Sequence, residues 1–537
     1  MSTSAKRACD ACHRRKVKCD GGLPCRNCSQ ASLSCTFNTV PQKKGPKGSR
    51  AKVISELREA QRQTQLALKL NDQWPIPPSQ VRTPGLLTPE MIKECTDFFF
   101  EHMYPTMPIL RRERLEQPLD SLETDSDAYC LVAAFCAFMI IQPGINVTGE
   151  AAGRVAEPTT YSTVNSGAAL LEEVLRVRKT YEYIENASQI TVTTSFFIFG
   201  CYFGLEKHNT AWFYLREATT LAQILGMEDE DAYSTINPLE SIVRRRLFWL
   251  LFVTERAYAL QRHRSLTLQA TVGLPTVEED AREPVDISGF NHLVNLFLPF
   301  GDVFIGLWNK IRSDCSPAWL AQLQQKLADA VPKGLKSPES QVADLKTSQQ
   351  WLRTMVWQLS ISNGYLSSSS ADSSMTFKYP IEIARDLLAV TGQLSRQSME
   401  VHGIGLIEKL FDVACTLTDV MACVPLDSAT FEIGPRDYLM ELVNLISTLR
   451  GGESRFLPLL LVKINDSLPH LSPSPSLSGT CSLLAEDVMD CQSPIMGSGD
   501  AIAAIATTAE WNAYVSAPSI LESATAYRTD IKHDYSQ

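Results

Sequence analysis

Six cysteines lie close together near the start of the chain, and their spacing constrains the fold more than any other feature. They are Cys9, Cys12, Cys19, Cys25, Cys28 and Cys35. The pattern is C-x2-C-x6-C-x5-C-x2-C-x6-C, so the unit C-x2-C-x6-C occurs twice. A segment this short cannot bury enough apolar surface to fold unaided. We therefore expect covalent or metal cross-links to supply its folding energy.

Metal ions explain this repeat better than disulfides do. The first 20 residues contain no apolar run typical of an export signal, so we expect a reducing compartment in which thiols stay free. Thiolates in tetrahedral sets of four suit Zn²⁺. One zinc ion would leave two of the six sulfur atoms unused. Two zinc ions need eight ligand positions, so two sulfur atoms must bridge. We predict two zinc ions as cofactors.

The two halves of the repeat differ in charge. The stretch between the second and third cysteines is His13, Arg14, Arg15, Lys16, Val17 and Lys18. The equivalent stretch of the second half, SQASLS, has no charge. Residues 1–55 carry 12 Lys and Arg against 2 Asp, whereas the whole chain has a net charge of -10. A basic head on an acidic body is typical of a polyanion-binding module, and only the first half can present a cationic helix to phosphates.

These residues resemble the fungal Zn(II)2Cys6 binuclear-cluster domain of transcription factors. The resemblance covers all six cysteines, the basic stretch and Pro24 in the joining loop. It implies that Cys9 and Cys25 bridge the two zinc ions and that the basic helix enters the major groove of double-stranded DNA at a CGG-type triplet. Lys16 occupies the position of the family's base-contacting lysine, and a lysine can reach guanine O6 and N7. The expected DNA-binding residues are His13, Arg14, Arg15, Lys16 and Lys18, with Arg15 and Lys18 mainly on phosphates. The alternative is a structural zinc site that binds no DNA.

We expect four regions. They are a DNA-binding domain at 1–37, a basic linker with a short coiled coil at 38–87, a large all-α regulatory domain at 88–455, and a Ser/Pro-rich segment and tail at 456–537. Residues 42–50 (QKKGPKGSR) are basic and rich in Gly and Pro. They could contact the DNA backbone or serve as a nuclear import signal, and the alternative is a solvated linker with no other role. Residues 52–73 carry a heptad-like stripe, which predicts either a coiled coil that forms a homodimer or an ordinary amphipathic helix.

The body of the chain is predicted to be all-α, because strand-like alternation is scarce. The triplet Thr88-Pro89-Glu90 is a helix start, and further helices are expected over 208–227, 239–261, 340–361, 380–395, 402–424 and 435–450. The apolar run 130–141 is shorter than the roughly 20 residues that cross a bilayer, so we expect a buried helix and no membrane. Residues 90–400 are similar to the middle homology region of the same fungal regulators. Within them, the stretch WLRTMVWQLSISNGYLSSSS resembles regulators of amylase and maltose use.

Three further features each admit two interpretations. The first is a run of three arginines, Arg244, Arg245 and Arg246, which could form an anion-binding site. We expect instead that they form ion pairs with carboxylates such as Glu240 and Glu255. The aromatic stretch 195–204 packs in the core or lines a ligand pocket, and we favour the core. Residues 481–490 (CSLLAEDVMD) form an activation segment that folds on a coactivator, or a surface helix.

The sequence contains no phosphate loop, H-E-x-x-H helix, nucleophile elbow or dinucleotide fingerprint, so we do not expect an enzyme. We predict a nuclear, zinc-dependent, sequence-specific DNA-binding transcription factor for RNA polymerase II genes. We expect a pathway-specific activator of a secondary-metabolite gene cluster or of a carbon-source regulon. The alternative is a repressor, or a zinc-containing adaptor without an activation function.

Overall fold

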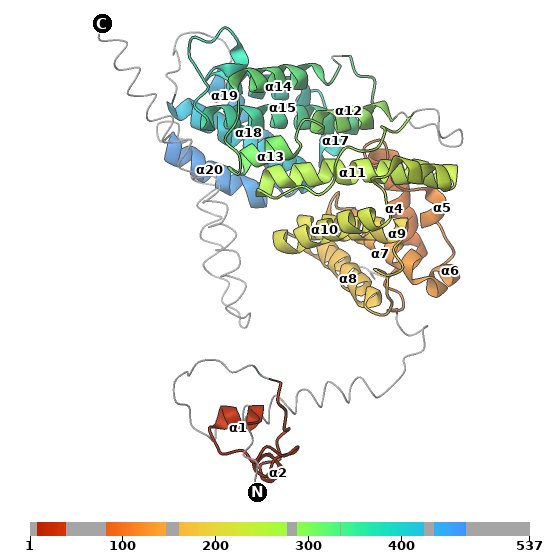
Figure 1. The fold of residues 1–537 in the computed structure, drawn as a ribbon. Coiled ribbons are helices and arrows are strands. Elements are labelled where there is room, and N and C mark those ends of the chain that lie inside the picture. Colours follow the sequence, from red (N-terminus) through yellow and green to blue (C-terminus); the bar gives the residue numbers. More distant parts are fainter. Residues whose placement is uncertain are drawn as a thin grey trace, which may run out of the picture. The chain divides into compact units, whose positions relative to one another are not determined.

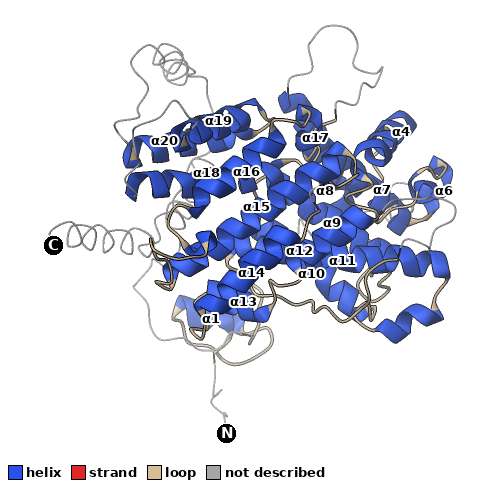
Figure 2. Cartoon of the chain, turned by 90° about the horizontal axis from the view of Figure 1, so that it is seen from above, coloured by secondary structure: helices blue, strands red, loops and turns tan. Residues whose placement is uncertain are grey.

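The computed structural model describes residues 8–38, 82–145, 160–276, 287–332, 334–423 and 434–468. All regular secondary structure in these ranges is helical (Figure 2), which confirms the predicted mostly-α fold. The chain divides into two compact units, Met1–Val81 and Arg82–Gln537. The basic run at 42–50, the heptad stripe at 52–73 and the activation segment at 481–490 lie outside the described residues.

The smaller unit contains two short helices, α1 (Asp10–Arg15) and α2 (Arg26–Gln30). The helices of the larger unit are, in chain order, α4 (Pro89–Phe98), η2 (Phe99–Met103), α5 (Arg112–Leu115), α6 (Leu119–Thr124), α7 (Ser126–Ile141), α8 (Thr160–Arg178), α9 (Gln189–Gly204), α10 (His208–Ile224), η3 (Glu230–Thr235), α11 (Pro238–Arg262), α12 (Ser288–Phe297), α13 (Asp302–Trp308), α14 (Pro317–Asp329), α15 (Glu339–Ser362), η5 (Ser373–Met375), α16 (Tyr379–Thr391), α17 (Arg396–Glu400), α18 (Ile404–Cys423), α19 (Pro435–Thr448), η6 (Gly452–Phe456) and α20 (Leu457–Ser467).

Several helix ends follow from local sequence chemistry. The hydroxyl of Thr88 accepts a hydrogen bond from Met91 N at 3.2 Å and caps α4, whose first residue is proline. After α10 the chain turns at Gly226, where φ is 65°, a conformation that glycine adopts without strain. The apolar run in α7 is buried from Ala128 to Ile141, as predicted.

The larger unit consists of two groups of helices joined by α11 (Figure 1). In the N-terminal helical group, which we define as α4–α10, α7 packs on α8 and α9, and α9 packs on α10. In the C-terminal helical group, α12–α20, α15 packs on α14, α16 and α18, and α18 packs on α19 and α20. Helix α11 contacts α9 and α10 on one side and α12 and α13 on the other. The two groups also meet directly, since Ser340 of α15 donates to the carbonyl of His102 at 2.9 Å and Arg455 of η6 pairs with Glu206 at 3.2 Å.

The three successive arginines of α11 do not make the predicted ion pairs. Arg245 pairs with Glu230 at 2.6 Å, and Arg244 donates to the carbonyl of Leu225. Arg246 is 2% exposed, and its Nε has no hydrogen-bond partner. Glu240 and Glu255 pair instead with Arg114 and Arg216. Successive residues of a helix point about 100° apart, so the partners of such a run come from different neighbouring segments and cannot be read from spacing along one helix.

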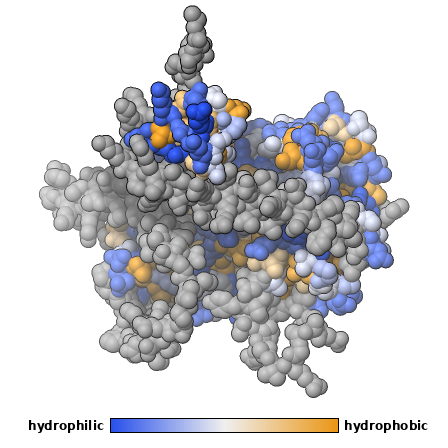
Figure 3. Space-filling model, turned by 90° about the horizontal axis from the view of Figure 1, so that it is seen from below, coloured by the Kyte–Doolittle hydropathy of each residue, from blue (hydrophilic) through white to orange (hydrophobic). Residues whose placement is uncertain are grey.

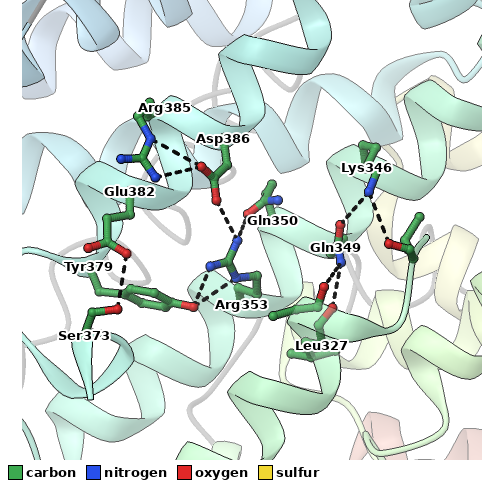
Figure 4. A network of polar contacts seen from close by, with 12 residues as sticks. Leu327, Lys346, Gln349, Gln350, Arg353, Ser373, Tyr379, Glu382, Arg385 and Asp386 are labelled. Carbon is green, nitrogen blue, oxygen red and sulfur yellow. Dashed lines mark hydrogen bonds and ion pairs between the residues drawn. The ribbon is translucent and has the colours of Figure 1, made fainter. Parts of the chain in front are cut away.

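A polar network centred on Arg353 joins α15 to α16 inside the C-terminal helical group (Figure 4). Its guanidinium donates to the hydroxyl of Tyr379 at 2.7 and 3.0 Å and to Oε1 of Gln350 at 2.6 Å, and it pairs with Asp386 at 3.2 Å. Arg353 is 8% exposed. A buried guanidinium needs several acceptors to offset its lost hydration, and this network provides them.

Among the described residues that are visible in Figure 3, hydrophilic and hydrophobic ones are interspersed, and the hydrophobic ones form small separate patches. No single helix of the described ranges is long and apolar enough to cross a bilayer; α12 and α13 reach that length and composition only as a pair bent by 52°.

Candidate metal centre and nucleic-acid interface

The two halves of the cysteine repeat fold alike. Helix α1 follows Cys9, and α2 follows Cys25 in the second half. After each helix one residue adopts the left-handed conformation, Lys16 at φ 53° and Ser32 at φ 51°. The backbone hydrogen bonds also repeat, because residue 17 donates to the carbonyl of residue 12 at 3.2 Å and residue 33 donates to that of residue 28 at 3.0 Å. The repeated spacing in the sequence thus corresponds to a repeated backbone conformation.

The six thiols form two groups of four that share two members. One group is Cys9, Cys12, Cys19 and Cys25, and the other is Cys9, Cys25, Cys28 and Cys35, with all sulfur atoms of a group within 4.8 Å of one another. The Sγ–Sγ distance is 3.7 Å between Cys9 and Cys25, 3.6 Å between Cys9 and Cys28, and 3.5 Å between Cys12 and Cys25. A tetrahedron with Zn–S bonds of about 2.3 Å has S–S edges of about 3.8 Å. The two groups therefore fit two zinc ions joined by the Cys9 and Cys25 sulfur atoms.

Backbone N–H groups point at the sulfur atoms that close each half. Cys9 N donates to Sγ of Cys19 at 3.5 Å, and Cys25 N donates to Sγ of Cys35 at 3.3 Å. Gly21 N adds a second donor to Cys19 at 3.4 Å. Such outer contacts orient thiolate ligands and stabilise their negative charge.

The ionisation of the thiols indicates why this cluster needs a cation. Burial raises the pKa of Cys12 to about 12 and raises that of Cys9 as well. Burial also opposes the ionisation of Cys25, but hydrogen bonds from the Cys28 backbone and from neighbouring thiols outweigh it and lower the pKa to about 6. Packed this closely, the thiols do not all ionise near neutral pH on their own. Zinc supplies the positive charge that deprotonates its ligands, and its binding energy becomes folding energy.

Two aspartates fasten the chain around the thiols. The carboxylate of Asp10 accepts hydrogen bonds from the hydroxyl of Thr36 at 2.9 Å and from Asn38 N at 2.6 Å. The carboxylate of Asp20 accepts from Arg26 N at 3.0 Å and from Gly22 N at 3.3 Å. Residues 36–38 are thereby held at the beginning of α1, and residues 20–26 form a closed loop. Neither role was predicted from the sequence.

The predicted DNA-binding residues lie in and just after α1. The side chains of His13, Arg14, Lys16 and Lys18 are exposed. Arg15 is half-buried, and its guanidinium donates to the carbonyl of Asn27 at 3.5 Å. The amide of Asn27 in turn donates to the carbonyl of Lys18 at 2.6 Å. The second half of the repeat thus supports the basic stretch through Asn27. The cysteine pattern does not indicate this role of Asn27.

Comparison with known protein families agrees with this geometry. Residues 7–45 match the model of the fungal Zn(2)-Cys(6) binuclear cluster domain. Residues 96–396, more than half of the chain, match the model of the fungal specific transcription factor domain. The chain belongs to the Zn(II)2Cys6 fungal transcription factors. Members of this family bind two zinc ions and DNA, and the family implies a nuclear location and a regulatory rather than enzymatic role.

Several regulators of sugar use are similar to this transcription factor over most of its length. The maltose fermentation regulatory protein MAL13 of Saccharomyces cerevisiae is 26% identical over 422 residues, which cover 78% of this chain and 85% of that protein. The probable sucrose utilization protein SUC1 of Candida albicans is 26% identical over 450 residues and 83% of each chain. The azaphilone cluster-specific transcription factor azaR of Aspergillus niger is 33% identical over 123 residues, or 20% of this chain.

Proposed function

We propose that this transcription factor activates genes for the use of a carbon source of the maltose or sucrose type. The observation that carries the proposal is the extent of the similarity to MAL13 and SUC1, which covers 78% and 83% of this chain and so includes most of the regulatory body. The similarity to the regulator of a secondary-metabolite cluster covers a much smaller part of the chain. Growth of a deletion strain of the source fungus on maltose, sucrose and glucose tests the proposal. We expect slow growth on one of the disaccharides alone, and equal growth on all three would contradict it.

In this proposal the six cysteines hold two zinc ions, and α1 reads a CGG-type triplet. Cys9 and Cys25 are the bridging ligands. Lys16 contacts guanine in the major groove, while the other exposed cations, His13, Arg14 and Lys18, contact phosphates. The half-buried Arg15 supports the loop and adds positive charge. The exposure of Lys16 at the end of α1 supports its assignment as the base reader.

The assignment of base reader and phosphate contact is tested by a matched pair of variants. Lys16→Ala and Lys18→Ala each remove one exposed cation from the same loop. In a selection from random duplexes with the zinc-loaded full chain, we expect Lys16→Ala to lose discrimination at one base, at a cost of about 1–3 kcal/mol. We expect Lys18→Ala to weaken binding to all sequences and to reduce the salt dependence by about one phosphate contact. Equal behaviour of the two variants would refute the assignment.

The direction of regulation and the oligomeric state are tested separately. A reporter gene with CGG-type sites should rise in expression when the full chain is present, because we assign activation to the acidic and apolar segment 481–490 and a coactivator. A fall would identify a repressor, and no change an adaptor. The heptad stripe at 52–73 leads us to propose a homodimer in the nucleus. Enrichment of paired triplets at one fixed spacing would support the dimer, whereas single triplets would identify a monomer.

A further inference from the structure

A cavity of about 210 Å³, partly open to solvent, lies in the larger unit where the N-terminal helical group, α11 and the C-terminal helical group meet. Its walls include residues of α7 and α9, of α11, and of α12, α15 and α18. For comparison, an engineered cavity of about 150 Å³ in another protein binds benzene. Small ligands bind preferentially in concave, mostly apolar sites of this kind, between helices of a helical domain.

Aromatic and aliphatic side chains form most of the cavity wall. Phe199 and Phe203 of α9 face it together with Tyr258 of α11 and Phe297 of α12. The aromatic stretch 195–204 is largely buried in the core, as we favoured, and four of its residues also line the cavity. Such a wall favours flat apolar ligands, which gain contact with ring faces and edges.

Two polar side chains on this wall have no partner. Gln261, at the end of α11, is 5% exposed, and its side-chain amide makes no hydrogen bond within the described part of the chain. The hydroxyl of Thr106 is buried and also has no hydrogen-bond partner. Other polar side chains on the wall are satisfied, since the Gln142 amide donates to the carbonyl of Gly200 at 2.7 Å and the Thr254 hydroxyl to that of Leu250 at 2.8 Å. The unpaired buried hydroxyl of Thr106 is costly, and a polar group of a ligand would relieve that cost. The Gln261 amide is accessible from the cavity and can bind the same polar group.

The charged groups of the cavity largely neutralise each other. Lys409 pairs with Asp344 at 3.2 Å and donates to the hydroxyl of Ser348 at 2.7 Å. The ring of His402 lies 2.7 Å from the carbonyl of Ser340, and burial lowers its pKa, so it is neutral near pH 7 and donates to that carbonyl. The site therefore offers hydrogen-bonding groups without a strong net charge. It suits a neutral ligand better than an anion.

We infer that this cavity binds a small, mainly apolar molecule of roughly 10–15 heavy atoms that carries one hydroxyl or carbonyl group for Gln261. A free disaccharide does not fit, because nearly every carbon carries a hydroxyl that would lose its hydration without finding a partner. A ligand in this place contacts both helical groups and α11 at once. It therefore stabilises one arrangement of the two groups and couples ligand binding to the state of the regulatory body. The inference is independent of the sugar regulon proposed above.

Calorimetric titration of the zinc-loaded full chain tests the inference, with 2-naphthol, naphthalene and maltose as probes. We expect 2-naphthol to bind with a dissociation constant on the order of 100 µM, naphthalene more weakly, and maltose not at all. The substitution Ala257→Leu places a larger side chain of α11 in the cavity. It should weaken the binding of 2-naphthol at least tenfold. The matched control is Ala389→Leu at an exposed position of α16, which should bind as the unaltered chain does.

The variant Gln261→Leu provides an independent measurement if Ala257→Leu does not melt cooperatively. It should not lower the melting temperature of the ligand-free chain, because the Gln261 amide makes no hydrogen bond in the described part of the chain that leucine would lose. It should also abolish the preference for 2-naphthol over naphthalene. The inference fails if 2-naphthol does not bind, if it binds Ala257→Leu as tightly as the unaltered chain, or if Gln261→Leu keeps the preference. It also fails if maltose binds in a way that Ala257→Leu abolishes.

Discussion

Replacing a shared cysteine and an unshared cysteine should have different consequences for zinc content. Cys25 belongs to both groups of four sulfur atoms, whereas Cys35 belongs to one. Structural zinc sites bind with about 10–16 kcal/mol, or about 2.5–4 kcal/mol for each of four ligands. Cys35→Ser should therefore weaken the binding of one ion by about 2.5–4 kcal/mol and leave the other in place. Cys25→Ser should weaken the binding of both ions and remove the bridge between them, a loss of about 5–8 kcal/mol in total.

The measurement is the zinc content of the purified chain after dialysis against a chelator of nanomolar affinity. We expect about two ions for each unaltered chain, about one for Cys35→Ser and none for Cys25→Ser. Cys315→Ser is the matched control, because Cys315 lies in the larger unit, far along the chain from the cluster, and should leave both ions bound. Equal zinc loss from Cys25→Ser and Cys35→Ser would refute the shared-ligand arrangement.

Three further predictions concern stability. Arg353→Met should destabilise the larger unit by about 3–5 kcal/mol, because it leaves the Tyr379 hydroxyl and Oε1 of Gln350 without their donor and removes one of the two arginine partners of Asp386. Tyr379→Phe should cost about 1–2 kcal/mol, because it removes one acceptor of Arg353. Denaturant unfolding measures both losses, and equal losses would contradict the network. Burial raises the pKa of Asp412 to about 7, so between about pH 4 and pH 7 the folded state keeps a proton that the unfolded state has lost, and stability falls as pH rises. Asp412→Asn should therefore match the unaltered chain in melting temperature at pH 5 and exceed it at pH 8, and a constant difference would contradict this sign. Asp10→Ala should lower the stability of the zinc-loaded cluster by about 1–2 kcal/mol, since two hydrogen bonds from residues 36–38 are lost, and faster hydrogen exchange of Asn38 N would reveal it.

The parts of the structure that follow local rules could be predicted from the sequence. The doubled cysteine unit implied two bridged metal ions, because six sulfur atoms can fill the eight ligand positions of two ions only if two of them are shared. The capped start of α4 at Thr88 and the long apolar face of α11 were also predictable, since capping and helical periodicity involve residues within a few positions of one another. The all-α character of the body followed from the same periodicity.

The features that were missed depend on contacts between distant segments. The partners of Arg244–Arg246 come from other helices and loops, so spacing within α11 could not identify them. Asn27 braces the basic stretch from the other half of the cluster. The cavity beside Gln261 requires three separate parts of the chain to meet, and an unpaired amide is visible only once its neighbours are placed. Sequence periodicity identified the aromatic stretch 195–204 as buried, but it cannot distinguish a filled core from the wall of a cavity.

The hydrogen bonds that the Asp10 carboxylate accepts from residues 36 and 38 bear on how binding sites are arranged in a promoter. They fix the point at which the chain leaves the cluster, directly beside the first turn of α1. In the complex that we propose, α1 lies on an asymmetric triplet in one direction only, so Asn38 would lie toward the same end of every triplet. Inverting a single triplet in a promoter would then reverse the side on which residue 38 lies. In the proposed dimer, triplets in direct, inverted and everted order would therefore place the two Asn38 residues at three different separations.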